Sequence, residues 1–166
     1  MLLLTGQRNY GAAVDMWGVG CIMAEMWTRT PIMQGRTEQN QLFLISKLCG
    51  SINPETWPGV QNLELYDKLE FPSSSRRVIS RLRPYTNNLM ACDLIDKLLC
   101  LDPSKRIDAN SALEHDFFWT DPMPFRLEKM LSSLEKSMFQ YSGSQRITAT
   151  IARQTNQNDS LKDLIY

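Results

Sequence analysis

Residues 14–28 form the segment that most constrains how this chain can fold. A helix drawn through them would carry apolar side chains on every face: Val14, Met16, Trp17, Val19, Cys21, Ile22, Met23, Ala24, Met26 and Trp27. Such a helix is typical of the centre of a core. Gly18 and Gly20 each cost roughly 1 kcal/mol relative to alanine in a helix. The segment therefore predicts a central helix that another backbone approaches closely at its glycines.

Further helices are predicted on both sides of a long irregular stretch. Thr37 is a good N-cap for a helix that carries an apolar stripe and ends at Gly50. A clearly amphipathic helix follows over residues 89–100, with Ala91, Leu94, Ile95 and Leu98 on one side, and we expect Asp102-Pro103 to end it. Between these helices, residues 51–88 show little periodicity and contain four prolines. We expect short helical turns there, near 53–55 and 63–69.

The sequence of the C-terminal third predicts helices that are shorter than those before it. Asp108 can cap a short helix that turns Ala112 and Leu113 inward, followed by an aromatic anchor of Phe117, Phe118 and Trp119. A last helix is expected within residues 124–138. From about 140 the sequence is polar and predicts a disordered tail. No stretch predicts a β-strand, so the fold class is mainly α: a helical bundle with a long irregular insert and no substantial sheet.

Composition excludes several functional classes. The 18 basic and 18 acidic residues cancel, which gives no case for direct binding of nucleic acid or of an anionic membrane. The four cysteines form no Cys-x-x-Cys pair and are accompanied by a single histidine, so we expect no metal site and reduced thiols in an intracellular protein: Cys21, Cys49, Cys92 and Cys100. The opening Leu2-Leu3-Leu4 is too short for a signal peptide, and no stretch has the ~20 apolar residues of a membrane helix.

Two separated motifs resemble the helical large lobe of eukaryotic protein kinases. The first is Asp15-x-Trp17-Gly18-x-Gly20, which looks like the start of the central helix of that lobe. The resemblance implies that Asp15 accepts hydrogen bonds from backbone amides of the catalytic loop. A carboxylate in the first helical turn suits this role, because it lies at the positive end of the helix dipole. Taken alone, such an aspartate is usually only a cap.

The second motif is Leu101-Asp102-Pro103-x-x-Arg106. In kinases the corresponding arginine pairs with the glutamate that closes the activation segment, and a planar guanidinium suits a partly buried carboxylate. The resemblance aligns that glutamate with Met1, so the carboxylate that pairs with the arginine in kinases is replaced here by a methionine. Breaking a buried pair typically costs about 3–5 kcal/mol, and we therefore expect a less stable lobe.

Within the protein kinases, the sequence most resembles the cyclin-dependent kinases. This resemblance is carried by residues 27–35, 37–39, 48–52 and 115–124, and it extends from about Leu2 to Tyr141. It implies a partial kinase domain over residues 1–139 and a polar tail over 140–166. It also implies a nuclear serine/threonine kinase of transcription elongation that uses ATP and magnesium, partners a cyclin and phosphorylates the tail of RNA polymerase II.

The motifs that perform phosphoryl transfer do not occur in these 166 residues. The sequence contains no glycine-rich phosphate loop, no His-Arg-Asp loop and no Asp-Phe-Gly metal site. We therefore assign no catalytic, cofactor-binding or metal residue, and the main cyclin surface is also expected to be missing. Asp15, Trp17, Gly18, Gly20 and Arg106 are assigned as structural positions of the family. His115 is expected to pack rather than to catalyse.

Two interpretations remain open from the sequence. In the first, the chain is a truncated piece of a cyclin-dependent kinase and is inactive by itself. In the second, it is a non-catalytic helical binding module that competes for kinase partners or substrates. An unrelated all-α protein would require coincidence across several separate motifs.

Overall fold

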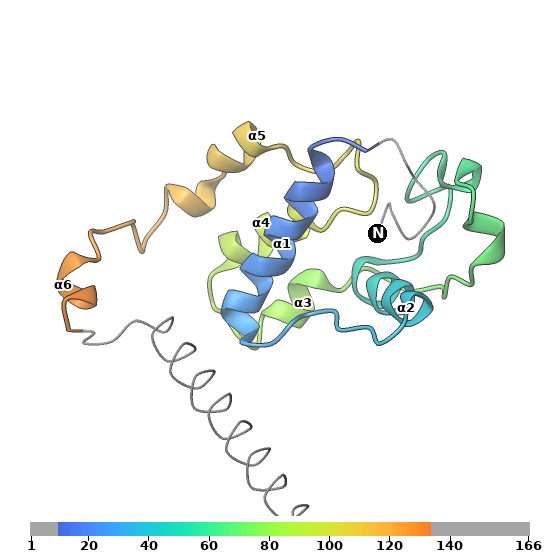
Figure 1. Cartoon of the computed structure of the whole chain (residues 1–166). Helices are drawn as coiled ribbons and strands as arrows, with labels where there is room; N and C mark the ends of the chain where they lie inside the picture. Colours follow the sequence, from blue (N-terminus) through green and yellow to red (C-terminus); the bar gives the residue numbers. More distant parts are fainter. Residues whose placement is uncertain (1–9, 134–166) are drawn as a thin grey trace, which may run out of the picture. The chain divides into compact units, whose positions relative to one another are not determined.

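The computed structural model of the chain describes residues 10–133, and this part is helical and contains no β-strand (Figure 1). The predicted mainly α fold class is confirmed. In chain order the α-helices and the short 3-10 helices (η) are α1 (Ala13–Thr28), α2 (Glu38–Cys49), η2 (Val60–Asn62), η3 (Tyr66–Lys68), α3 (Val78–Leu82), α4 (Leu89–Leu98), α5 (Ala109–Leu113), η4 (Asp116–Phe118) and α6 (Glu128–Leu131).

The chain divides into two compact units, and the boundary in the sequence lies between Met123 and Pro124. The second unit contains α6, which lies within the range 124–138 in which a last helix was predicted, and residues 134–138 of that range lie outside the described residues. It also contains an ion pair between Arg126 and Glu128 at 2.8 Å. The predicted domain boundary at 139/140 and the polar tail lie outside the described residues and stay predictions.

Helix α4 is the centre of the first unit. Its predicted apolar stripe is buried, as are Cys92 and the following Leu99, and the exposed fraction of these side chains does not exceed 2%. Helices α1 and α3 both pack against it, and α1 crosses α4 in Figure 1. The core continues into α2 and the insert through Ile45, Ile52, Trp57, Val60 and Val78. Helix α4, rather than α1, is therefore the element on which most of the others pack: α1, α3 and η4 contact it, whereas α2 contacts α3.

The close approach predicted for the glycines of α1 occurs at Gly20. A Cβ added there would lie 2.8 Å from the Cβ of Leu98 and 3.0 Å from a methyl carbon of Leu99. The Cβ of Leu98 is fixed to the backbone of α4, and the side chain of Leu99 is fully buried, so neither can move aside easily. At Gly18 an added Cβ would meet nothing within 4 Å. Only one of the two glycines is thus required for helix packing in the described structure.

The prediction that α1 is buried on all faces is wrong. Val19, Ile22 and Met26 are 47%, 65% and 68% exposed, and they follow one another along one face of the helix. Only Gly20 and Ala24 of this helix are fully buried. The opposite face provides Val14, Trp17, Cys21 and Trp27 to the core. Helix α1 is therefore a boundary element with an exposed apolar row.

The helix starts follow the capping residues of the sequence. The hydroxyl of Thr37 accepts from the amide of Asn40 at 3.1 Å, and the carboxylate of Asp108 accepts from the amide of Ser111 at 2.9 Å. Asn88 caps α4 in the same way, a cap that the sequence analysis did not assign. Gly50 ends α2 with a φ of 101°, a conformation that favours glycine. Helix α4 ends at Leu98, before the predicted stop at Asp102-Pro103.

The insert is held by a few specific contacts. Trp57 is 5% exposed, and the rings of Tyr66 and Phe71 stack at 5.2 Å. The hydroxyl of Ser51 donates to the carbonyl of Ser74 at 3.0 Å and links the start of the insert to a residue in its second half. The turn predicted near 53–55 is present, since the amide of Trp57 donates to the carbonyl of Asn53 at 2.9 Å, and the turn predicted near 63–69 contains η3. Neither η2 nor helix α3 was predicted, because each is too short for a periodic signal.

The side-chain directions predicted after Asp108 are partly wrong. Ala112 is buried and Phe117 packs beside it, but Leu113 and Trp119 are 64% and 68% exposed. Phe118 is 37% exposed. Helix α5 has only five residues, so it presents one residue per turn to the core, and the aromatic run does not form a single buried anchor.

The contact at Gly20 yields a prediction with a matched control. Gly20→Ala should lower the free energy of unfolding by about 1–3 kcal/mol, because its Cβ overpacks the α1–α4 contact. Gly18→Ala has open space and should raise stability by up to about 1 kcal/mol through helix propensity. Urea unfolding followed by circular dichroism measures both. Equal stabilities of the two variants would show that α1 and α4 do not approach as described.

Candidate functional site

Arg106 joins the two sequence motifs at one place in the fold. Its side chain is buried with 8% exposure, and its Nε and one Nη donate to the carbonyl of Cys100 at 3.0 and 2.8 Å. The other Nη donates to the carbonyl of Ala13 in the first turn of α1. The guanidinium carbon also lies 5.0 Å from the ring centre of Trp17. Arg106 therefore connects the start of α1 to the loop after α4.

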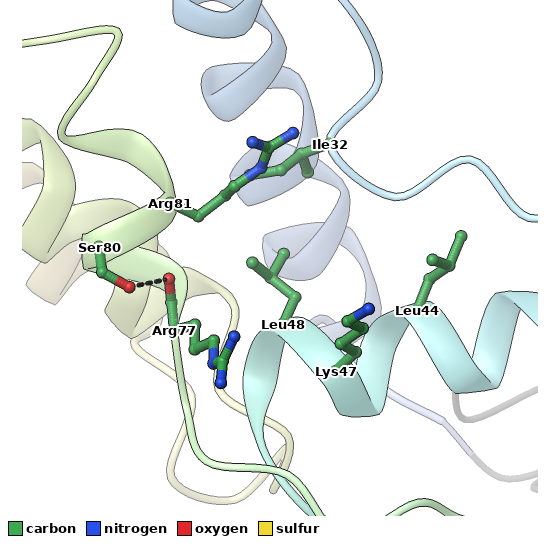
Figure 2. Close-up of a pocket in the computed structure, with 7 residues that line it drawn as sticks. All are labelled: Ile32, Leu44, Lys47, Leu48, Arg77, Ser80 and Arg81. Atoms are coloured by element: carbon green, nitrogen blue, oxygen red, sulfur yellow. Dashed lines mark hydrogen bonds between the residues drawn. The ribbon is translucent and has the colours of Figure 1, made fainter.

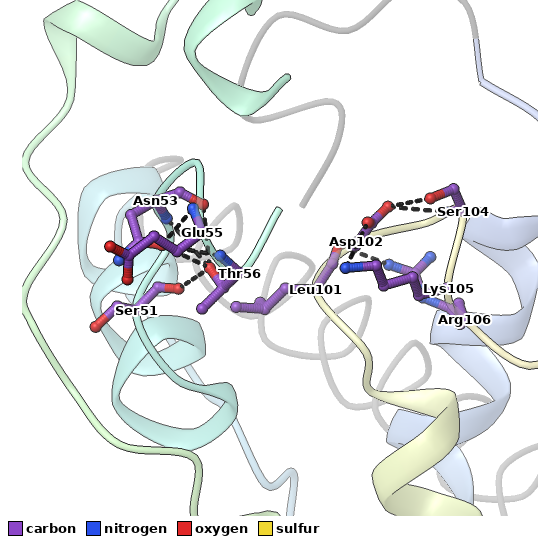
Figure 3. Close-up of polar contacts among 9 residues, drawn as sticks. All are labelled: Ser51, Asn53, Glu55, Thr56, Leu101, Asp102, Ser104, Lys105 and Arg106. Atoms are coloured by element: carbon purple, nitrogen blue, oxygen red, sulfur yellow. Dashed lines mark hydrogen bonds and ion pairs between the residues drawn. The ribbon is translucent and has the colours of Figure 1, made fainter. Parts of the chain in front are cut away.

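The loop that carries Arg106 is folded around Asp102. This carboxylate is 4% exposed and accepts from the amide and the hydroxyl of Ser104 at 2.9 and 2.7 Å (Figure 3). Lys105 adds a longer ion pair at 3.8 Å. The Asp-Pro-Ser sequence thus forms a tight turn that places Arg106 beneath α1.

Among the described residues, carbonyl groups rather than a carboxylate compensate the charge of Arg106. No acidic side chain within residues 10–133 forms an ion pair with it. Burial lowers the pKa of the guanidinium, because desolvation disfavours the charged form, although an arginine remains charged at neutral pH. The mate predicted at position 1 lies outside the described residues, so the lost pairing stays a prediction.

The remaining structural positions are distributed along α1. Asp15 is exposed in the first turn, and its carboxylate makes no hydrogen bond or ion pair with a described residue. Trp17 lies on Arg106, Gly20 contacts α4, and Gly18 contacts neither. The structure therefore brings together Trp17 and Arg106 but does not engage Asp15, whose implied role toward a catalytic loop stays a prediction.

His115 connects α4 to η4. Its Nδ1 accepts from the amide of Phe117 at 3.1 Å, which assigns the proton to Nε2, and Nε2 lies 2.8 Å from Oδ2 of Asp93. Lys97 Nζ contacts the same oxygen at 2.7 Å. The hydrogen bond from Lys97 and a weaker contribution from His115 lower the pKa of Asp93 despite some burial. The ring is 7% exposed, and among the described residues no serine, threonine or cysteine side chain forms a hydrogen bond with it.

The surroundings of three thiols, those of Cys21, Cys49 and Cys92, make them poorly reactive. All four cysteines are free, and Cys49 and Cys92 are buried. Burial raises the pKa of Cys49 to about 12 and raises the pKa values of Cys21 and Cys92 as well. A thiol with a raised pKa is protonated at neutral pH and is a poor nucleophile. Cys21, Cys49 and Cys92 act as small apolar core residues.

Metal-ligating side chains do not cluster in the described residues. Within them, no group of three or more histidine, cysteine, aspartate or glutamate side chains is placed to hold a metal ion. A polar hollow of about 780 Å³ is lined by Asp96 among others, but the carboxylate of Asp96 already forms an ion pair with Arg76 at 2.8 Å.

In the described part of the chain no helix is both long and apolar enough to cross a membrane.

Comparison with known proteins decides the family. The model of the protein kinase domain matches residues 2–118. The chain belongs to the protein kinase family. Among curated relatives it is 62% identical over 140 residues to cyclin-dependent kinase 9 of Xenopus tropicalis and 57% identical over 159 residues to cyclin-dependent kinase 9 of Homo sapiens. These alignments cover 84% and 95% of the chain.

The solved structures agree with this assignment. A chain in the structure of the CAK complex of Chaetomium thermophilum bound to ATP-gamma-S matches with a TM-score of 0.68 and 42% sequence identity, over 76% of this chain and 40% of that one. The chain spans 37% and 43% of the length of the two curated relatives. The predicted resemblance to the cyclin-dependent kinases, and to the helical large lobe of the kinase fold, is confirmed, and the curated relatives identify cyclin-dependent kinase 9 as the member that the chain resembles.

Arg106 yields a prediction on stability. Arg106→Lys should lower the free energy of unfolding by about 1.5–3 kcal/mol, because a single ammonium nitrogen would replace the three separate guanidinium nitrogens that reach the carbonyls of Cys100, Leu101 and Ala13. Arg126→Lys is the control, since the side chain of Arg126 is 87% exposed. Urea unfolding measures both, and an Arg106→Lys protein within about 0.5 kcal/mol of the control would contradict the role assigned to the guanidinium.

Asp93 yields a prediction on pH. Its folded-state pKa lies below the unfolded value, so its contribution to stability is present above about pH 4 and is lost as the pH falls through the folded pKa. Asp93→Asn should therefore reduce the loss of stability between about pH 5 and pH 3. The control is Glu64→Gln, an exposed residue without an ion pair among the described residues. Identical pH profiles of the two variants would exclude the proposed Asp93 contacts.

Proposed function

We propose that this chain is the helical, C-terminal part of the large lobe of a cyclin-dependent serine/threonine kinase that acts in transcription elongation. The complete enzyme would partner a cyclin in the nucleus and transfer phosphate from ATP, with magnesium, to Ser-Pro repeats of the RNA polymerase II tail. The segment spanned here would supply the scaffold of that enzyme.

The observation that carries the proposal is the Arg106 arrangement in a chain so similar to cyclin-dependent kinase 9. Arg106 ties the loop after α4 to Trp17 and to the first turn of α1. That turn carries Asp15, which is exposed and free to accept hydrogen bonds from a segment outside the described residues. A rigidly held helix start with an exposed carboxylate suits the support of a catalytic loop.

The polypeptide of 166 residues is proposed to be inactive when isolated. Its sequence contains none of the groups that cradle phosphates, bind magnesium or orient a hydroxyl group in kinases. The relatives are more than twice as long, and we propose that the corresponding parts of a complete kinase hold the nucleotide, the metal and most of the cyclin surface.

A second function is favoured by the exposed row of α1. Val19, Ile22 and Met26 offer an apolar helix face that a partner protein could cover. A stand-alone chain could use it to compete for kinase partners or substrates. The transcript upstream of the Met1 codon separates the two proposals, since in-frame His-Arg-Asp and Asp-Phe-Gly codons support the kinase and an in-frame stop codon supports the binding module.

A chimera tests the proposed kinase scaffold. The part of human cyclin-dependent kinase 9 that precedes the aligned region is joined to this chain and expressed with its cyclin. Transfer of labelled phosphate from ATP to a polymerase-tail peptide is then measured. We expect turnover by the chimera, at least a tenfold loss of kcat with Arg106→Leu, and no turnover by the isolated chain of 166 residues.

The outcomes separate scaffold from binding module. A folded, cyclin-bound chimera without turnover would contradict the kinase scaffold and favour the binding module. Turnover by the isolated chain, surviving removal of contaminating kinases, would contradict its proposed inactivity. Arg126→Lys in the chimera is the matched control and should retain full turnover.

A further inference from the structure

A hollow of about 480 Å³ lies between α2 and α3, away from Arg106 and α1's exposed row. Its floor is aliphatic and consists of Ile32, Leu44 and Leu48, of which Leu48 is 8% exposed. Figure 2 shows Leu48 between two basic side chains, with Arg81 on one side and Lys47 on the other. We call this hollow the α2–α3 groove.

The rim of the α2–α3 groove is basic. Lys47, Arg77 and Arg81 line it together with Ser80, and no acidic residue does. None of these three cations forms an ion pair with a residue of the described part of the chain, whereas the adjacent Arg76 is paired with Asp96. Three like charges around an apolar floor repel one another and would be stabilised by an anionic partner.

The groove is held in place by the backbone. The amide of Arg77 donates to the carbonyl of Leu48 at 2.8 Å, which fixes α3 against the end of α2. The hydroxyl of Ser80 donates to the carbonyl of Arg77 at 3.0 Å. The cationic groups of Lys47 and Arg81 lie 5.9 and 5.7 Å from the rings of Phe43 and Tyr85. The basic rim is therefore partly ordered before any ligand binds, which reduces the entropy cost of binding.

The chemistry of the groove selects among possible ligands. Its volume accommodates one or two side chains rather than a whole helix. Single-stranded RNA usually stacks on aromatic platforms, but the floor here is aliphatic. An anionic membrane is disfavoured by the zero net charge of the chain. A peptide with an apolar residue between carboxylates matches both the floor and the rim, because carboxylates make strong hydrogen bonds to arginine.

We propose that the α2–α3 groove is a docking site for an acidic segment of a partner protein. An apolar side chain of the segment contacts Leu44 and Leu48, and carboxylates on either side pair with Lys47, Arg77 and Arg81. The proposal does not depend on phosphoryl transfer, since all residues involved lie outside the Arg106 arrangement and within the part of the chain that the structure describes.

Fluorescence anisotropy with the full chain tests this proposal. The probe is a labelled synthetic peptide rich in glutamate with two central leucines, and the reference probe replaces every glutamate by glutamine. We expect binding of the acidic probe alone, with affinity falling at least tenfold between about 50 and 500 mM salt, because salt screens exposed charges. Lys47→Glu/Arg81→Glu should weaken binding at least tenfold through charge reversal at the rim.

The control variant is Arg36→Glu/Lys68→Glu, which makes the same change of charge at exposed positions outside the groove. It should bind as the unchanged chain does. Circular dichroism checks the fold of each variant, and Lys47→Gln/Arg81→Gln replaces the first pair if charge reversal unfolds the chain. Methyl NMR of the unchanged chain gives independent evidence, since the probe should shift the methyl signals of Ile32, Leu44 and Leu48.

Three results would overturn the proposal. The first is equal weakening by the groove and control variants, which would indicate non-specific attraction. The second is binding of the acidic probe without a shift of the three methyl signals, which would place it elsewhere. The third is equally tight and equally variant-sensitive binding of a uridine oligonucleotide, which would make the groove a general anion site rather than a peptide-docking site.

Discussion

The buried guanidinium of Arg106 is the contact on which the arrangement of the helices depends. It donates to carbonyls on both sides of the core, at Ala13 in α1 and at Cys100 and Leu101 after α4. A buried charge is tolerated only when it is well hydrogen-bonded, and within the described residues no buried side-chain nitrogen or oxygen lacks a partner. This single side chain thus fixes the start of α1 relative to α4, while Gly20 fixes its middle.

Much of the helical framework could be predicted from the sequence, because local signals agreed with the fold. Thr37, Asp108 and Gly50 mark helix ends through their own side-chain or backbone chemistry, and the stripe of α4 has a strong helical period. The orientation of α1 could not be predicted, since an all-apolar segment has no preferred face. Helix α3 was missed because one helical turn carries almost no periodic signal.

Only those residues of the site that belong to the two kinase-like motifs could be predicted from the sequence. The motifs identified Trp17 and Arg106 as structural positions, yet nothing in the sequence indicated that the guanidinium would bind carbonyls and lie on the indole ring. The Asp93–His115 contact joins residues distant in sequence and needed the fold to bring them together. The basic rim of the α2–α3 groove likewise combines α2 and α3, so only the structure shows that these cations share one apolar floor.

The central claim is that Arg106 and Trp17 act together to hold α1 on the rest of the lobe. A double-mutant cycle measures this directly, using the urea unfolding free energies of Arg106→Lys, Trp17→Leu and the double variant. The account predicts a coupling of about 0.5–3 kcal/mol, as expected for side chains in contact. A control cycle combines Arg106→Lys with Trp119→Leu. Because Trp119 is 68% exposed, the account predicts that these two substitutions have additive effects on the free energy of unfolding. Additive effects of Arg106 and Trp17 in a folded chain would contradict the account.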